Sequence, residues 1–502
     1  MPKKIYNNWL GGLTSYSLNI GKEGSYAEAR DVDPHRKPGF IVPGWAESNK
    51  TSSSGGVLAG LISSAVVDPD STDFYAISAT KVYKLTNAGT SFVNDANWPH
   101  AVPTAEDDRV DKEVFFYNVG NTSYLFYIMD TDIGRCDVSG PTFIDDYLTN
   151  ASYLNASALS DAPHPTIEWK TYRWIGDGRY LHKFDGQDGT YGSWDSGTNY
   201  PLDLGEGWEI TTLFPTRNYI GICAWYKHSP GPTYKTRARV FFWDGVSADY
   251  NYSIPIEDNK IISALNDNGR VYLVTEGREL GSVLRRLTEA GDIPLRHLKT
   301  FVSGAVTSFS NSQTVTNYRN TIDIFQNRVL IGATSTTRNM IFAFGSPDVT
   351  FPEALIQPYS CSDDPSSGGA IGFVGHLMKG SIYVSAYDGT NYYWMRFTGS
   401  YSSNALLKER YTETGQKIRI NYVKFYFQPL VSGDDVTVSL ETDYGTSHSL
   451  GTITYSTDGA ITSKRFNKII TCHAFRPVIQ WSSGGTAFSR IVIDYDFISD
   501  VG

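Results

Sequence analysis

The sequence predicts an all-β protein, in which a β-propeller is followed by a C-terminal β-sandwich. Three observations predict this fold class. A two-strand unit recurs seven times, β signals dominate the repeats, and residues 411–502 change to a different rhythm of alternating strands. The chain has 502 residues, which is too long for one ordinary small domain.

Each recurring unit has an apolar strand, a turn or longer loop, and a second strand that ends in a Gly or Asp-Gly turn. "KVYKLTNAG" (81–89), for example, is echoed by "LRRLTEAG" (284–291). The second strands follow one another at a mean step of about 52 residues. The seven units span 74–89, 124–140, 172–186, 219–245, 270–291, 328–346 and 381–400.

Such a period, filled by β signals, is typical of propeller blades with four strands each. One four-stranded sheet cannot bury both of its faces, whereas a closed ring of sheets can. We therefore predict about seven blades over residues 51–410, and six to eight blades all fit the uneven spacing. The echoed phrase would mark the third and fourth strands of blades four apart. The alternative is an irregular all-β fold with coincidentally similar strand ends.

Residues 411–502 contain six or more alternating strands with turns every 8–15 residues, which is the rhythm of a β-sandwich. Residues 1–50 differ from both parts, because they are rich in turn residues and have little periodicity. "SYAEARDV" (25–32) is their one helical hint. This segment is an irregular cap on the propeller or an arm that docks on a neighbouring subunit. The segment cannot fold alone, so it needs a partner surface. We favour the arm, binding by strand addition, because a cap of 50 residues is more than a closed propeller needs.

Composition excludes several classes of protein. A net charge of −10 argues against broad phosphate binding, and 19% charged with 40% hydrophobic residues argues against disorder. Four isolated cysteines without a CxxC pair predict buried free thiols in a reducing cell. The start "MPKKIYNNWLGG" lacks the apolar stretch of a secretory signal, and residues 55–67 are too short to span a bilayer.

Catalytic motifs are absent from the sequence: it has no phosphate loop, HExxH zinc site, GxSxG elbow or EF-hand. Segment 185–194 fails the Asp-box pattern of sialidases. We interpret the adjacent acidic pairs as solvated turns, although glycosidases do use two carboxylates. We therefore expect no catalytic, cofactor-binding or metal-binding residues. The acidic pairs are Asp107–Asp108, Asp145–Asp146, Asp363–Asp364 and Asp434–Asp435.

The start of the chain carries a distinctive phrase, "WLGGLTS" followed by "GSYAEARDVDPHRKPGF". It resembles the start of tailed-bacteriophage virion proteins of the nozzle or tail-tubular kind, which carry propeller and sandwich domains. Asp31 stands where Asn would be expected. The matching residues are Gly11, Gly12, Leu13, Ala29, Arg30, Asp31, Val32, Asp33, Arg36, Pro38 and Gly39.

This resemblance implies a non-enzymatic structural component of the virion tail (nozzle, adaptor or tail-tip-associated), made in the host cytoplasm and assembled as a homo-oligomeric ring. The implied partners are tail, portal or adaptor subunits, with transient contact to passing DNA, no sequence-specific nucleic-acid binding and no membrane insertion. No cofactor is implied. The candidate partner-contact residues are Trp9, Leu10, Gly11, Gly12, Leu13, Arg36 and Pro38.

Two other classes of function stay open. One is a carbohydrate-binding or carbohydrate-cleaving propeller, such as a tail adhesin that acts on host glycans. A deep carboxylate-lined pocket on the propeller axis would favour it. The other is a cytosolic scaffold propeller, which the N-terminal phrase disfavours.

Overall fold

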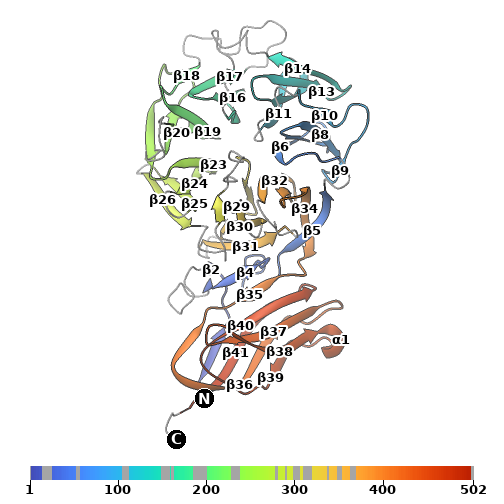
Figure 1. Ribbon diagram of the computed structural model, residues 1–502, viewed down its shortest axis with the longest axis vertical. Helices are drawn as coiled ribbons and strands as arrows, with labels where there is room; N and C mark the ends of the chain where they lie inside the picture. The colour runs from blue at the N-terminus through green and yellow to red at the C-terminus, as the bar shows by residue number, and fades with distance from the viewer. Residues whose placement is uncertain are drawn as a thin grey trace.

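The computed structural model places a ring of sheets above a curled C-terminal sheet (Figure 1). The structure describes residues 2–13, 25–52, 57–103, 112–148, 159, 163–184, 201–227, 238–277, 281–288, 291–297, 306–308, 319–335, 339–346, 353–361 and 369–498.

Seven antiparallel sheets form the ring, so the chain contains a seven-bladed β-propeller. Blade 1 contains β6 (Ile62–Val67), β7 (Phe74–Ser78), β8 (Lys81–Thr86) and β10 (His100–Ala101), with the short β9 (Ser91–Phe92) also paired to β8. Blade 2 contains β11 (Glu113–Val119), β12 (Thr122–Ile128), β13 (Ile133–Asp137) and β14 (Thr142–Leu148). Blade 3 contains β15 (Thr166–Trp169), β16 (Tyr172–Asp177), β17 (Tyr180–Phe184) and β18 (Leu202–Asp203).

The remaining blades repeat this plan. Blade 4 contains β19 (Trp208–Pro215), β20 (Ile220–Tyr226), β21 (Ala238–Trp243) and β22 (Tyr252–Ile256). Blade 5 contains β23 (Lys260–Asp267), β24 (Arg270–Gly277), β25 (Gly281–Thr288) and β26 (Gly291–His297). Blade 6 contains β28 (Ile322–Phe325), β29 (Arg328–Ser335), β30 (Asn339–Gly345) and β31 (Ala354–Ser360), with β27 (Val306–Ser308) also paired to β29. Blade 7 contains β32 (Ala370–Met378), β33 (Ser381–Tyr387), β34 (Tyr392–Tyr401) and β5 (Trp45–Ser52).

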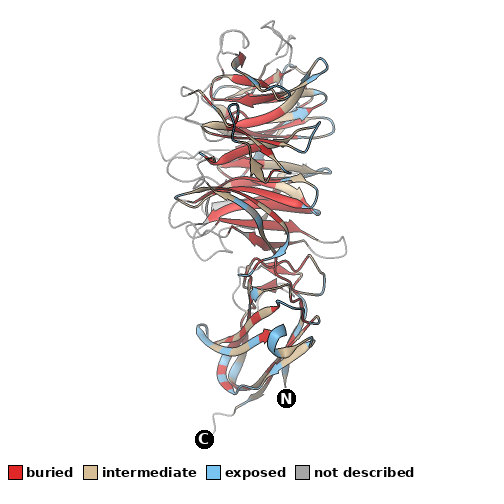
Figure 2. Cartoon of the chain, turned by 90° about the vertical axis from the view of Figure 1, so that its right-hand side faces the viewer, coloured by how far each residue is buried: buried red, intermediate tan, exposed pale blue. Residues whose placement is uncertain are grey.

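The seven sequence repeats are the second and third strands of the seven blades, paired side by side in every case. Val82 and Leu284 lie in different sheets, of blades 1 and 5, so the echoed phrase does return four blades later. These strands are buried along most of their length, because neighbouring blades cover both faces (Figure 2). The predicted propeller is therefore confirmed.

Strand β5 closes the ring, because it pairs antiparallel with β34 over Trp45–Tyr401 to Ser52–Tyr393. The last blade thus takes its outer strand from the start of the chain. The expected boundary at residue 51 needs correction, since the propeller already includes residues 45–52.

The C-terminal part is one curled nine-stranded network (Figure 1), and its core is continuous with that of propeller blades 5 and 6. It stands where the β-sandwich was predicted, and β36 and β40 bend so that each pairs with several neighbours. The C-terminal portion of this sheet begins at Leu406, before the expected boundary at 411, because β35 pairs with β40. Its strands are β1 (Lys3–Tyr6), β4 (Glu28–Arg30), β35 (Leu406–Lys408), β36 (Thr412–Phe427), β37 (Asp435–Thr442), β38 (Thr446–Thr454), β39 (Ser463–Phe466), β40 (Ile470–Ser483) and β41 (Phe488–Phe497), and the helix α1 (Tyr455–Asp458) follows β38.

The N-terminal segment, defined as the described residues from 2 to 44, begins as an edge strand of the C-terminal sheet and then runs between that sheet and the propeller (Figure 1). Its β1 pairs with β41, its β4 pairs with β35, and β2 (Gly12–Leu13) pairs in parallel with β3 (Ser25–Tyr26). The helical hint at 25–32 was wrong, because β3 and β4 form there and Tyr26 is buried in the joint core. That core runs from blades 5 and 6 through this segment into the C-terminal sheet.

A buried ion pair fixes the N-terminal segment to blade 6. Arg328 Nη1 donates to both Asp33 carboxylate oxygens, at 2.8 and 2.9 Å, and both side chains are 2% exposed. The Asp33 Oδ1 also accepts the backbone amides of His35 and Arg36, at 3.0 and 3.1 Å. These extra bonds offset the cost of burying the charges. Removing one partner would leave the other charge buried and alone.

The backbone of the segment also packs closely against β31. The Val32 amide donates to the Gln357 carbonyl, at 3.2 Å. A Cβ atom at Gly44 would lie 1.8 Å from the Pro358 carbonyl oxygen, which is far inside van der Waals contact. Only a residue without a side chain fits there.

The Gly44→Ala substitution is therefore expected to destabilise the protein by roughly 3 kcal/mol or more, because the backbone must move to relieve the clash. Gly140→Ala is the matched control, since no atom lies within 4 Å of its Cβ position. Thermal unfolding of the two variants tests this expectation. Equal melting temperatures would contradict the close packing of the N-terminal segment on blade 6.

Two buried titratable groups in this region give opposite pH dependences. Burial lowers the pKa of His35 to about 4, and the nearby Arg328 adds to this effect. His35 thus contributes stability that is lost as the pH falls from about 6.5 to about 4. Burial raises the pKa of Glu409 to about 7, although Trp9 Nε1 donates a hydrogen bond to it. Stability from Glu409 is lost as the pH rises from about 4.5 to about 7.

The Glu409→Gln variant should not lose stability as the pH rises from about 4.5 to about 7, because an amide oxygen still accepts the Trp9 hydrogen bond without becoming charged. We expect the variant to gain up to roughly 3 kcal/mol over the native protein at pH 8, and much less at pH 4.5. The loss of stability that His35 causes as the pH falls from about 6.5 to about 4 should be the same in both proteins. Melting temperatures of both proteins at the two pH values test this, and an equal difference at both would contradict it.

Candidate functional site

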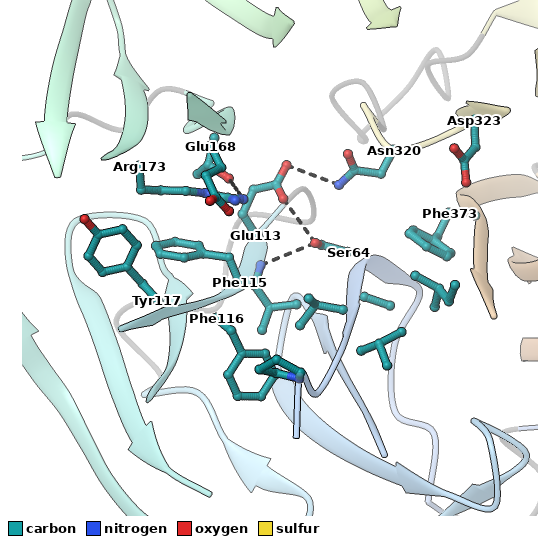
Figure 3. A pocket seen from close by; sticks show the side chains of 18 of the residues that line it. Ser64, Glu113, Phe115, Phe116, Tyr117, Glu168, Arg173, Asn320, Asp323 and Phe373 are labelled. Carbon is teal, nitrogen blue, oxygen red and sulfur yellow. Dashed lines mark hydrogen bonds between the residues drawn. The ribbon is translucent and has the colours of Figure 1, made fainter. Parts of the chain in front are cut away.

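A cavity of about 710 Å³ lies on the propeller axis (Figure 3). Blades 1, 2, 3, 6 and 7 line it, chiefly through their innermost strands. Its size falls within the usual range for small-molecule sites. We call it the axial cavity, and its polar lining residues include Ser64, Glu113, Glu168, Arg173, Asn320 and Asp323.

One end of the axial cavity is held by Glu113 of β11 and Arg319, which precedes β28. Arg319 Nε and Nη2 donate to Glu113 Oε1 at 3.1 and 3.0 Å, and the two side chains are 4% and 8% exposed. Arg319 Nη2 also donates to the His164 carbonyl at the entry to blade 3, at 3.3 Å. Ser64 Oγ of blade 1 donates to Glu113 Oε2, at 3.1 Å.

The neighbouring Asn320 extends these contacts. Its side-chain amide donates to the Ser63 carbonyl at 3.0 Å and to Glu113 Oε1 at 3.1 Å. Its own carbonyl accepts the Val374 amide of blade 7, at 2.7 Å. Ser263 Oγ of blade 5 donates to the Arg319 carbonyl. Two adjacent residues of blade 6 thus bond to blades 1, 2, 3, 5 and 7, and we call Glu113, Arg319 and Asn320 the axial hub.

Arg173 of β16 reaches into the axial cavity from blade 3 (Figure 3). Its guanidinium lies 4.4 Å from the Phe115 ring centre, and Nη2 donates to Thr166 Oγ1 at 2.5 Å. Its Nε is buried without a hydrogen-bond partner in the described part of the chain. Burial lowers the pKa of Arg173 to about 10, so the side chain stays cationic at neutral pH.

The other two carboxylates of the cavity differ in exposure and in the hydrogen bonds that they accept from the protein. Asp323 accepts the backbone amides of His376 and Ile324 on its two oxygens, and burial raises its pKa. Glu168 is exposed and lies directly opposite Arg173 in the β15–β16 pair, so the two side chains share one face of blade 3. A glycosidase needs two carboxyl groups available to one substrate. Here Glu113 and Asp323 are already hydrogen-bonded to the protein.

The structure corrects the expectation that the N-terminal phrase presents exposed contact residues. Trp9 is 2% exposed and bonds to Glu409, and Gly11 and Gly12 are buried, because all three pack inside their own chain. Leu10 is half-buried. The side chain of Leu13 lies outside the described residues.

The two remaining partner-contact candidates lie further along the segment. Arg36 is half-buried, and its guanidinium lies 5.3 Å from the Trp45 ring centre and 4.7 Å from that of Tyr401. Pro38 is exposed. The seven candidates therefore do not form one exposed surface.

Other sequence candidates have structural roles where they are described. The Asp434 carboxylate accepts the Val431 and Gly485 amides, at 2.9 and 3.1 Å, and so shapes a turn. Segment 185–194 and the pairs at 107–108 and 363–364 lie outside the described residues. The four cysteines are buried and free, as predicted. Within the described ranges, no group of three or more His, Cys, Asp or Glu residues could hold a metal, and no helix is long and apolar enough to cross a bilayer.

The residues of the axial cavity were not singled out from the sequence. Most are isolated polar residues in or just before a first strand, Arg173 lies in the second strand of blade 3, and five blades must close into a ring before they meet. One usable signal existed. The first strand precedes each recognised strand pair, so polar residues at those positions are candidates to face the axis.

Comparisons with known proteins bear on the architecture only. No protein-family model matches the chain, and no curated protein matches it. Among solved structures, the WD40 domain of Pan2 from Neurospora crassa is similar with a TM-score of 0.41 and 9% identity, covering 71% of this chain and 98% of that one. An exo-β-1,3-galactanase from Phanerochaete chrysosporium, solved with galactose, has a TM-score of 0.33 and 11% identity, covering 91% and 100%. Likenesses at this level carry no argument about function.

The Glu113→Gln substitution tests the axial hub. It should lower the free energy of unfolding by roughly 3 kcal/mol, because the buried Arg319 charge loses its counter-ion. Glu168→Gln is the control, and its change should stay within about 0.5 kcal/mol because Glu168 is exposed. Thermal unfolding of both variants measures the difference. A Glu113→Gln protein as stable as the control would contradict the role of the hub.

Proposed function

We propose that the protein is a non-enzymatic structural subunit of a bacteriophage virion tail, placed as a nozzle, adaptor or tail-tip-associated component and assembled in a symmetric ring. The observation that carries this proposal is the position of the N-terminal phrase that resembles tail proteins. Its residues join the propeller to the C-terminal sheet, which makes the two parts one body.

Several contacts of the phrase support this interpretation. Asp33 forms the buried pair with Arg328, and Asp31 accepts a hydrogen bond from Ser402 Oγ at 3.2 Å. Gly12 has a φ of +72°, and a Cβ there would lie 2.5 Å from the Leu355 carbonyl oxygen. Each contact ties the start of the chain to residues more than 290 positions away. The phrase therefore acts as a joint within the subunit.

Exposed apolar side chains indicate where subunits could meet. Among the described residues, eleven large apolar side chains are exposed, and six of them belong to the C-terminal sheet and its loops. If subunits meet through this part of the fold, these side chains are the apolar surface available to the contact. The six are Ile5, Val431, Tyr444, Tyr455, Ile469 and Phe497.

The cleaving alternative is less well supported, because Glu113 and Asp323 are held by bonds within the protein. A cytosolic scaffold role has no feature in its favour beyond the propeller itself. Neither alternative uses the joint formed by the N-terminal phrase.

Negative-stain images of the purified protein test the proposal, together with mass spectrometry of virions. We expect symmetric rings, and we expect Ile469→Asp, at a side chain that is 74% exposed, to reduce ring formation. Val246→Asp on blade 4, where the side chain is 64% exposed, serves as the control and should leave rings intact. A chain that stays monomeric at all concentrations and is absent from virions would refute the proposal. So would sugar release that is lost when one carboxylate is removed.

A further inference from the structure

We propose that the axial cavity binds a neutral sugar, held by Arg173 and Glu168 against an aromatic wall. This inference does not depend on a role in the tail, since it rests on the cavity alone. Among the described residues, the bonds that join blades around the axis are made by Glu113, Arg319 and Asn320. The side chains of Arg173 and Glu168, which line the cavity from blade 3, take no part in those bonds.

The first argument is the hydrogen-bonding capacity of Arg173. A single described acceptor, Thr166 Oγ1, bonds to its guanidinium, and the buried Nε has no partner among the residues described. Leaving a buried donor unpaired costs about 1–3 kcal/mol. An oxygen atom of a bound ligand would recover that energy. Arg173 therefore favours a ligand with acceptor oxygens close to blade 3.

The second argument is that acceptors lie beside this donor. Glu168 shares the face of blade 3 with Arg173, and no hydrogen bond or ion pair holds its carboxylate within the described chain. Asp323 lies across the cavity on blade 6 (Figure 3). A hydroxyl group can donate to a carboxylate and accept from a guanidinium at the same time. A ring with several hydroxyl groups satisfies both kinds of partner.

The third argument is charge. The acidic and basic side chains among the described residues that line the cavity are Glu113, Glu168, Asp323 and Arg173. Arg319 offsets the charge of Glu113, and Arg173 is the one cation left to face two carboxylates. The cavity carries no surplus of positive charge, so an anionic ligand would be repelled. A neutral polyhydroxy ligand meets no such penalty.

The fourth argument is shape. The volume of about 710 Å³ accommodates one or two sugar rings. Phe115 is 1% exposed beneath the guanidinium, whereas Phe116 and Tyr117 are half-buried lining residues. Tyr117 is fixed in the wall because its hydroxyl donates to the Thr171 carbonyl at 3.0 Å. Aromatic side chains of this kind pack against the apolar C–H face of a sugar. The cavity therefore combines an apolar wall with the Arg173 donor and the Glu168 acceptor.

Binding of glucose, galactose, N-acetylglucosamine and their β-linked disaccharides to the full chain tests this proposal, by calorimetry and saturation-transfer NMR. At least one of these neutral sugars should bind, and Arg173→Gln should weaken its affinity by about tenfold or more. Arg179→Gln is the matched control, because Arg179 lies in the same blade, pairs with Asp203 and does not line the cavity. It should bind like the native protein.

If Arg173→Gln does not fold, Glu168→Gln takes its place, because that residue is exposed and its loss leaves the ring intact. It should weaken the same sugar by several-fold. Failure of all these sugars to bind, or equal affinity in the native and both cavity variants, would overturn the proposal. Tighter binding of glucuronate than of glucose would overturn the assignment to a neutral ligand.

Discussion

Closure of the propeller ring by β5 is the constraint on which the rest of the molecule depends. Without that strand, blade 7 would have three strands and an open edge at β34. Since β5 comes from residues 45–52, the chain before it must run along the propeller toward its own C-terminal sheet. The buried Asp33–Arg328 pair and the close backbone contact between Gly44 and Pro358 fix that path. The propeller and the C-terminal sheet are joined as a consequence.

The same closure creates the axial hub and the axial cavity. Residues from five blades approach one another only because the ring is complete, and a charged pair placed there becomes buried. Glu113 and Arg319 are 206 positions apart, yet they share two hydrogen bonds. Both carboxylate oxygens of Glu113 accept hydrogen bonds from neighbouring blades. What stays available in the cavity is the blade 3 wall, with one cation and one exposed carboxylate.

The propeller could be predicted because the second and third strands of each blade appear in the sequence as long apolar runs that end in a tight turn. Burial on both faces produces those runs, as in β30, where all seven residues are buried. The N-terminal segment was misjudged for the opposite reason. Its strands are two to four residues long before β5, and its partners, such as Arg328 and Glu409, lie hundreds of positions away. No local periodicity marks a segment whose structure depends on such distant contacts.

The axial cavity could not be predicted for a similar reason. Arg173 and Asp323 are single polar residues in separate blades, and they line one cavity only after the ring has closed. The strand repeat reveals the order of the blades, but not which side chain faces the axis. The strand pairing in the structure shows which side chains share a face, as for Glu168, which lies opposite Arg173.

Native-state hydrogen exchange of β5 tests the central claim most directly. If β5 closes the ring, the β5 amides that bond to β34 should exchange as slowly as those of β33 and β34, because all three strands open only when the propeller unfolds. The amides of β4 should show similar protection, since the N-terminal segment is held between the two parts. Exchange of β5 at the rate of an exposed terminus, with β33 and β34 still protected, would contradict the account.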